Sequence, residues 1–308
     1  MGYAKRRSTS SRRTTRGPYR RYTAKRRSLG KAKRPYRRTY RKKPMTKRRI
    51  LNATSTKKKD NMLISTNTTA ANPIGGATYT TNPAILIGAQ TFDYVFPFLC
   101  TYRDFTTRTG GSHGFASDTS TRSASTVFMR GYKECITIQT SDGVPWLWRR
   151  ILISLKGPLI AEISSVFNVA QENSAGFTRV VNAANPGQRA NVYNLIFDGT
   201  QDADWNSPID AKLDRNRVTV MYDKTITLAS GNEDGMIRKY NRWHGFNKNF
   251  VYDDDKAGGQ ENGSGYHAQG KAGMGDVYVI DIFRPRTGTT TATQLSLHMQ
   301  GTLYWHEK

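Results

Sequence analysis

The amino-acid sequence predicts an all-β body preceded by a basic arm, on three observations. Residues 1–59 contain 25 Lys and Arg and no Asp or Glu, whereas residues 60–308 contain 23 basic and 23 acidic residues. From about Thr78 onward, short segments rich in β-branched and aromatic residues alternate with loops of Gly, Ser, Thr, Asn and Asp, which is typical of strands and turns. Helical periodicity is scarce. We therefore divide the chain into an arm, residues 1–59, and a body, residues 60–308.

The arm is a low-complexity segment of Arg and Lys pairs separated by Ser, Thr, Gly, Pro and Tyr. Pro18, Pro35 and Pro44 oppose a long helix, because proline lacks the backbone N–H that a helix uses. So few apolar residues cannot offset the entropy of ordering the chain, so we expect the arm to stay disordered until it meets a polyanion. Nucleic acid is the polyanion that such a segment predicts.

The body contains eight predicted strands, and residues 237–251 are a candidate for a ninth. In Arg217–Ala229, Val218, Val220 and Tyr222 fall on one face and Thr219, Met221 and Asp223 on the other, as in a half-buried strand. The eight segments are Ala84–Ala89, Phe92–Cys100, Thr126–Thr140, Pro145–Lys156, Val192–Phe197, Arg217–Ala229, Asp276–Arg284 and Gln294–Trp305. The best helix prediction is Ser207–Leu213, with Ser at the N-cap and Pro at the first helical position.

The connections between these strands indicate the type of sandwich. Loops such as 104–125, 157–190 and 253–275 are about twenty residues or longer, whereas up-and-down barrels more often have tight turns. We expect one domain, an eight-stranded antiparallel jelly-roll sandwich with long loops. An immunoglobulin-like sandwich is the second choice.

The arm holds the candidate nucleic-acid-binding residues. Guanidinium and ammonium groups neutralise phosphates, and tyrosine rings can stack on unpaired bases. The alternative is a solubilising tail with incidental tyrosines. The predicted binding residues are Arg6, Arg7, Arg12, Arg13, Arg20, Arg21, Arg26, Arg27, Arg37, Arg38, Arg48, Arg49, Tyr19, Tyr22, Tyr36 and Tyr40. Basic clusters also suit nuclear-import receptors, and the residues predicted for import are Lys33, Arg34, Arg37, Arg38, Arg41, Lys42, Lys43, Lys47, Arg48 and Arg49.

Catalytic and metal-binding patterns are weak, so we expect no enzyme activity, cofactor or metal site. Gly265–Ala272 resembles a phosphate-binding loop, but Ala272 stands where that loop needs a hydroxyl, and a predicted strand follows instead of a helix. The histidines lack zinc spacing, and Asp253–Asp255 lacks the spaced oxygen ligands of a calcium loop. No apolar run is long enough for a membrane helix, and no apolar leader follows the basic start, so we expect neither membrane insertion nor secretion.

The large aromatic residues divide into two groups. Trp146 and Trp148 flank one residue of a predicted strand, so both indoles face the same side and are expected in the core. Trp205, Trp243 and Tyr266 lie in or near Gly-, Asn- and Asp-rich loops, where large aromatic residues can anchor contacts between subunits. Packing within the subunit is the alternative.

The partition of charge predicts assembly that depends on a polyanion. Neutral bodies can approach one another without net repulsion, whereas the arms repel each other until their charge is neutralised. About 60 copies in the smallest icosahedral shell would gather roughly 1,500 positive charges, comparable to the phosphates of a small single-stranded genome. The genome would then be both cargo and assembly partner.

Several segments resemble the capsid proteins of genomoviruses. They are VMYDKTITL (220–228), RKYNRWHG (238–245), NFVYDDD (249–255), GDVYV (275–279), GTLYWHEK (301–308) and RRILN (48–52). The resemblance implies a jelly-roll subunit of a small icosahedral virion that encloses circular single-stranded DNA and is related to geminivirus coat proteins. It also implies assembly in the host nucleus, with about 60 copies in one shell or a joined-shell variant. The alternative is a non-viral nucleic-acid-binding protein of the ribosomal or chromatin-associated type.

Overall fold

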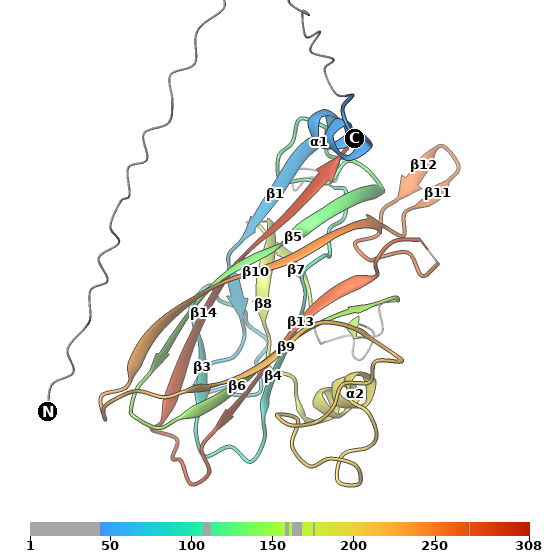
Figure 1. Cartoon of the computed structure of the whole chain (residues 1–308). Helices are drawn as coiled ribbons and strands as arrows, with labels where there is room; N and C mark the ends of the chain where they lie inside the picture. The colour runs from blue at the N-terminus through green and yellow to red at the C-terminus, as the bar shows by residue number, and fades with distance from the viewer. Residues whose placement is uncertain (1–43, 107–111, 158–159, 162–167, 175, 271) are drawn as a thin grey trace, which may run out of the picture. The chain divides into compact units, whose positions relative to one another are not determined.

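The computed structural model of the protein describes residues 44–106, 112–157, 160–161, 168–174, 176–270 and 272–308. The chain divides into two compact units, Met1–Met45 and Thr46–Lys308. The second unit is mostly β, and its main sheets are antiparallel (Figure 1). The predicted all-β antiparallel fold is therefore confirmed at this level.

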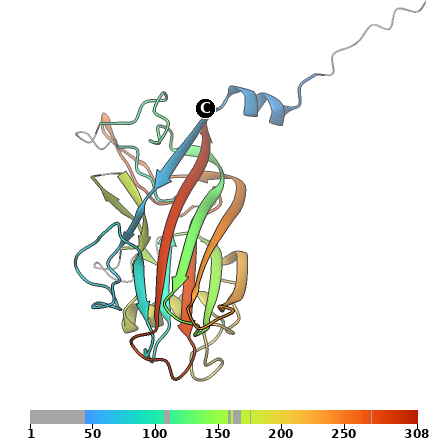
Figure 2. The same ribbon diagram turned by 90° about the vertical axis from the view of Figure 1, so that its left-hand side faces the viewer.

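Two sheets form the centre of the second unit. The first sheet has the order β1-β14-β5-β10, with β3 also paired to β14, and the second has the order β4-β13-β6-β9. The strands of the first sheet are β1 (Thr56–Met62), β3 (Ala84–Ile87), β5 (Thr126–Thr140), β10 (Met236–Val251) and β14 (Gln294–Glu307). Those of the second are β4 (Tyr94–Leu99), β6 (Trp146–Leu155), β9 (Thr219–Leu228) and β13 (Asp276–Pro285). Strands distant in sequence lie side by side in both sheets (Figure 2).

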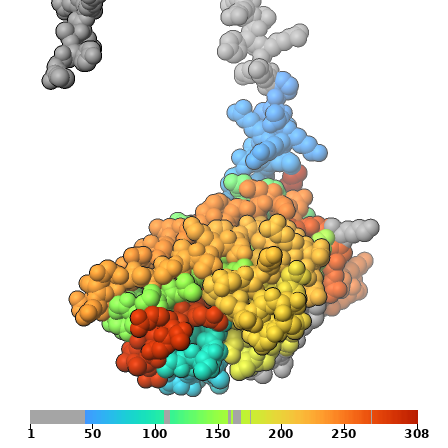
Figure 3. All heavy atoms as spheres, turned by 60° about the horizontal axis from the view of Figure 1, so that its bottom comes forward, coloured from blue at the N-terminus to red at the C-terminus, as the bar shows by residue number. Residues whose placement is uncertain are grey.

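Smaller elements surround this pair of sheets. They are α1 (Lys47–Thr54), α2 (Pro186–Ile196), the three-stranded sheet of β2 (Ile64–Thr66), β8 (Gly176–Val181) and β7 (Gln171–Asn173), and the hairpin of β11 (Asp255–Ala257) and β12 (Gln260–Asn262). The second sheet packs on one side against the first sheet and on the other against α2 and the chain that follows it. Figure 3 shows the yellow part of the chain, which includes α2 and the residues after it, at the surface of the molecule.

The two faces of β6 show how the sequence produces these layers. Trp146 and Trp148 face the first sheet and are at most 1% exposed, as predicted for core residues. Ile151 and Ile153 face the opposite way and pack with residues of α2. Because both faces are covered, the strand reads as a nearly continuous apolar run instead of an alternating one.

A buried cluster of four charged residues lies between the two sheets. Glu134 of β5, Arg150 of β6 and Asp281 of β13 are joined by Arg179 of β8, and all four are at most 2% exposed. Both Arg150–Asp281 hydrogen bonds are 2.8 Å long, and Arg179 lies 2.7 Å from Glu134 and 3.0 Å from Asp281. The cluster is neutral and connects both sheets to the small β2-β8-β7 sheet. No pattern in the sequence predicted it.

The predictions around α2 were wrong. Of residues 192–197, expected as a strand, 192–196 form the end of this helix and Phe197 is its C-cap. The helix begins at a capping box between Asn185 and Gln188, with Pro186 in the first turn. Val192 and Ile196 are buried one helical turn apart against the second sheet. A short apolar run does not distinguish a strand from a buried helix, so the periodicity misled the prediction.

The helix predicted over Ser207–Leu213 does not form, apart from a turn at residues 208–210. Instead, the Arg149 guanidinium donates hydrogen bonds to backbone carbonyl oxygens of this segment. They belong to Pro208, Ile209 and Ala211, at 2.7, 3.2 and 2.8 Å. A long-range contact therefore replaces the local hydrogen bonds that the sequence suggested.

Candidate nucleic-acid interface

Most of the predicted nucleic-acid-binding and nuclear-import residues, from Arg6 to Lys43, lie outside the described residues. The exceptions are Lys47, Arg48 and Arg49, which are exposed on α1. Residues 46–59 were assigned to the arm, but they belong to the second compact unit and form α1 and β1. The sequence boundary at residue 59 therefore falls inside a strand that is paired with β14.

Helix α1 is short and its formation is local. The Thr46 side chain caps it by accepting a hydrogen bond from the backbone N–H of Arg49, and the N–H of Ser55 closes its end on Leu51. No α1 residue is buried. Figure 2 shows the helix extending from the end of β1, next to the carboxyl end of β14. Its basic side chains are thus held beside the first sheet without being committed to the core.

A cavity of about 840 Å³ lies between α1 and the ends of β1, β5 and β14. Its lining includes the aromatic rings of Phe128 and His306 and five cationic side chains, those of Arg48, Arg49, Lys57, Arg130 and Lys308. We call it the α1 groove. The side-chain carboxylate of Glu307 in this lining pairs with Lys58 at 3.0 Å and is 4% exposed, so its charge is already neutralised.

The protonation of His306 reports the electrostatic character of the α1 groove. Burial lowers the pKa of this histidine, and the positive charges of Lys57 and Arg130 lower it further. Lys57 is the direct cross-strand neighbour of His306. Burial disfavours a charge of either sign, so it is the surplus of cations over carboxylates in the lining that makes the groove suited to a phosphate group.

The three aromatic residues proposed as subunit contacts lie in different environments. The Trp243 side chain is 52% exposed on β10, with its ring 5.6 Å from that of Tyr304. Trp205 packs edge-on against Phe197 at 5.0 Å, and Tyr266 packs against Tyr102 at 4.9 Å; both are partly buried. Trp205 and Tyr266 therefore both pack against the apolar cluster that includes α2, whereas Trp243 lies on the first sheet.

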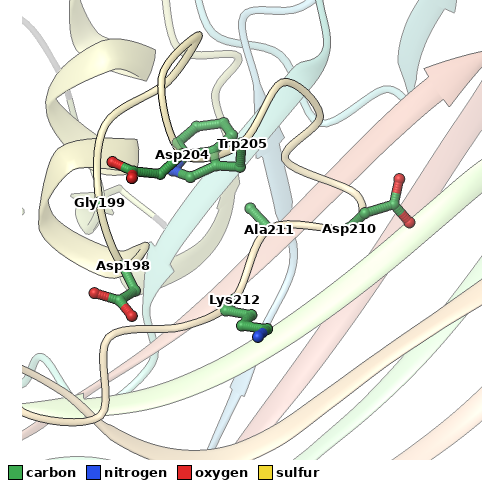
Figure 4. Close-up of a pocket in the computed structure, with 7 residues that line it drawn as sticks. All are labelled: Asp198, Gly199, Asp204, Trp205, Asp210, Ala211 and Lys212. Carbon is green, nitrogen blue, oxygen red and sulfur yellow. The ribbon is translucent and has the colours of Figure 1, made fainter.

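An acidic hollow of about 300 Å³ follows α2 and contrasts with the α1 groove. It is lined by Asp198, Gly199, Asp204, Trp205, Asp210, Ala211 and Lys212. Figure 4 shows its three carboxylates pointing in different directions. The Asp204 carboxylate accepts a 2.7 Å hydrogen bond from the backbone N–H of Thr200, so it is used within its own loop. The hollow is suited neither to phosphate nor to a shared ion.

The remaining weak motifs take structural positions. Gly265–Gly270 is a loop in which His267 forms an isolated antiparallel β-bridge with Tyr252. Strand β13 follows this loop, and Lys271 lies outside the described residues. Asp254 of the acidic triplet is paired with Arg122 at 2.5 Å and accepts from the N–H of Ser264. Within the ranges that the structure describes, there is no group of three or more His, Cys, Asp or Glu arranged to hold a metal ion. None of the described helices is long and apolar enough to cross a membrane.

Sequence reasoning missed the body side of this interface. From the sequence, Lys57 was assigned to the arm and Arg130 was given no role. Arg130 lies at a bulge of β5, where the register with β14 shifts between Tyr304 and Trp305. If side chains alternated strictly along β5, Arg130 would not be predicted on the same face as Lys57. The bulge adds one residue and so changes which side chains share a face. Comparison with models of protein families and with curated proteins gives no match for this chain.

Proposed function

We propose that this chain is a viral capsid protein that assembles into a small icosahedral shell and packages circular single-stranded DNA through its basic arm. The observation that carries the proposal is the segregation of charge, because the whole net charge of +25 lies in residues 1–59. Neutral bodies can tile without net repulsion, whereas the crowded arms need a polyanion to neutralise them. Closure of the shell and packaging of the genome are thereby coupled.

The strand order supports a jelly roll as the shell domain. The last strand, β14, lies between β1 and β5, and β13 lies between β4 and β6. Each sheet therefore interleaves early and late strands, as two Greek keys do when they are wound into two facing sheets. Such a body has a rigid centre and long loops, which is a suitable form for a subunit that contacts copies of itself on several sides.

The identity of the cargo and the place of assembly follow from the resemblance to genomovirus capsid proteins. It favours circular single-stranded DNA and assembly in the host nucleus, with the finished protein in the virion. Exposure of Lys47, Arg48 and Arg49 on α1 supports recognition by nuclear-import receptors, because these side chains are accessible in the folded subunit.

The test is assembly of the full-length chain, stripped of nucleic acid, with and without circular single-stranded DNA. We expect negative-stain microscopy to show closed particles of uniform size only when DNA is present, and the enclosed DNA to resist nuclease. A variant with the predicted arginines of residues 6–38 changed to Gln is the control, and it should not assemble with DNA. Monomers under both conditions would reject the proposal, and one discrete complex on a defined site would favour the non-viral alternative.

A further inference from the structure

The outer face of the first sheet carries basic side chains and no acidic ones. Burial alternates along its strands, so one set of residues points to the core and the other outward. The carboxylates of these strands all belong to the inner set: Asp60 pairs with Arg103, Glu134 joins the buried cluster, and Glu307 pairs with Lys58. The outward cations are Lys57, Lys59, Arg130, Lys133 and Lys239.

This bias is notable because residues 60–308 have no net charge. The acidic residues of the body are therefore placed elsewhere, for example in the hollow that follows α2. A face whose charged side chains are all basic attracts a polyanion and disfavours an equally basic copy of itself.

Two aromatic rings lie in the middle of this face. Trp243 is 52% exposed, and its ring lies 5.6 Å from that of Tyr304 at an interplanar angle of 66°. The indole lies across Gly131, since a Cβ added to this glycine would come within 2.8 Å of the Trp243 ring. Gly131 and its cross-strand neighbour Gly245 thus leave room for the indole to lie over the sheet.

The cations flank these rings in register. Lys59 is the cross-strand neighbour of Tyr304, and Lys133 is that of Trp243. Adjacent strands are about 4.8 Å apart, so each ammonium group is within reach of a phosphate whose base contacts the neighbouring ring. The next row, Lys57 and His306, belongs to the α1 groove, so the basic surface continues to the point where the arm enters the body.

We propose that Trp243 and Tyr304 form a base-stacking platform for single-stranded nucleic acid, and that Lys59, Lys133 and the α1 groove bind the adjoining phosphates. The inference deepens the proposed function and rests on it, because it assigns part of the nucleic-acid binding to the folded body. Exposed aromatic rings beside a basic track are how proteins bind single strands without reading their sequence. The arm would gather the strand, and the platform would hold one segment of it in a defined place.

The first experiment is photo-crosslinking of the full-length chain to an oligothymidylate that contains 5-bromodeoxyuridine, with the crosslinked peptides mapped by mass spectrometry. We expect crosslinks at Trp243 or Tyr304 in addition to crosslinks in the arm. Crosslinks confined to the arm would overturn the platform and leave the proposed function standing. The absence of both binding and crosslinks would overturn the proposed function itself.

The second experiment measures oligothymidylate affinity of full-length variants by fluorescence anisotropy over a range of salt concentrations. Trp243→Ala should weaken binding by roughly five-fold or more without changing the salt dependence, because stacking releases no counterions. A double variant, Lys59→Glu with Lys133→Glu, should instead reduce the slope of log affinity against log salt.

Matched controls separate this face from the rest of the surface. Phe115→Ala removes another exposed aromatic side chain, 71% accessible, and Lys256→Glu reverses an exposed charge on β11. Both controls should leave affinity within two-fold of the parent, beyond a small effect of net charge. The platform is overturned if Trp243→Ala behaves like Phe115→Ala. It is also overturned if Trp243→Ala changes only the oligomeric state, since the face would then be a contact between subunits.

Discussion

At the scale of single residues, four charges are buried between the sheets and depend on one another. Removing Glu134 and Arg150 from water is costly, and their mutual attraction offsets the cost only because each also has a second partner. Trp148 adds a 2.8 Å hydrogen bond from its indole N–H to Asp281. Although burial disfavours the carboxylate of Glu134, Arg150 and Arg179 outweigh it and lower its pKa to about 2.

Breaking this cluster should be strongly destabilising. Glu134→Gln leaves the two arginines with one carboxylate between them, so we expect the free energy of unfolding to fall by about 3–5 kcal/mol. The measurement is urea denaturation of the isolated subunit. Arg217→Met is the control, because its pair with Asp214 is 58% exposed on the arginine side and should be worth at most about 1 kcal/mol. Equal losses in the two variants would contradict this assignment.

His244 predicts a second residue-level effect, on pH dependence. Burial and the nearby Arg150 guanidinium lower the pKa of His244 from 6.5 to about 4. The unfolded state therefore binds the proton more readily, so stability due to neutral His244 is complete above about pH 6.5 and is lost as the pH falls toward 4. Asp276, whose pKa burial raises to about 7, titrates in the opposite sense.

The test compares the parent with His244→Gln between pH 4 and 7. We expect the stability difference between the two chains to change with pH in favour of the variant as the pH falls, since only the parent takes up the additional proton on unfolding. Because Asp276 is present in both chains, its contribution cancels. A difference that is constant over this range would exclude His244 as a source of the pH dependence.

At the scale of elements, β1 determines where the arm can be removed. It pairs with β14 along its whole length, and Lys58 on it neutralises Glu307. A deletion of residues 1–45 removes only the first compact unit, whereas a deletion of residues 1–59 cuts into β1 and leaves Glu307 without its cation. A truncation that is meant to leave the body intact should therefore end before β1 begins at Thr56.

We expect the chain lacking residues 1–45 to keep the thermal unfolding temperature of the parent within a few degrees. The chain lacking residues 1–59 should be less stable by several kcal/mol, from the lost ladder and the uncompensated buried carboxylate. Thermal unfolding followed by circular dichroism distinguishes the two. The same unfolding temperature for both truncations would show that β1 contributes nothing to the body.

Helix α2 depends on its first turn in a way that can be tested separately. The Asn185 side chain accepts a hydrogen bond from the backbone N–H of Gln188 at 3.0 Å, and the Gln188 side chain accepts from the N–H of Asn185 at 2.9 Å. Asn185→Ala should lower the free energy of unfolding by about 1 kcal/mol. Asn185→Ser, which keeps a capping oxygen, is the matched control and should recover most of that loss.

At the scale of the whole molecule, the distribution of charge predicts how binding responds to salt. Residues 1–45 hold 19 of the 25 surplus positive charges, so their removal leaves a net charge of about +6. We expect the affinity of the full chain for single-stranded DNA to fall steeply with salt, and the truncated chain to bind weakly with a much smaller slope. Titration at several salt concentrations measures both. A truncated chain that bound as tightly as the parent would overturn the role of the arm.

The sequence alone determined the features that depend on local composition and periodicity. The basic arm, the all-β class and the strands predicted at Thr126–Thr140 and Asp276–Arg284 follow from charge counts and from runs of β-branched and aromatic residues. The longest strand, β10, was only a candidate within 237–251, because its many polar and charged residues weaken this signal. The prediction that Trp146 and Trp148 lie in the core was confirmed.

Only the tertiary structure decided the features that depend on contacts between distant segments. Arg149 binds the carbonyl groups of the segment expected as a helix at 207–213, and β14 pairs with residues 56–62. A bulge at Arg130 interrupts the regular alternation of β5, and Arg130 lines the same groove as Lys57. Charged partners in the core come from four strands, and their mutual attraction leaves no local pattern in the sequence. The physical reason is that propensity acts over a few residues, whereas electrostatic pairing and sheet register join distant segments of the chain. Arg179, for example, lies 45 residues from Glu134 and 102 residues from Asp281 in the sequence.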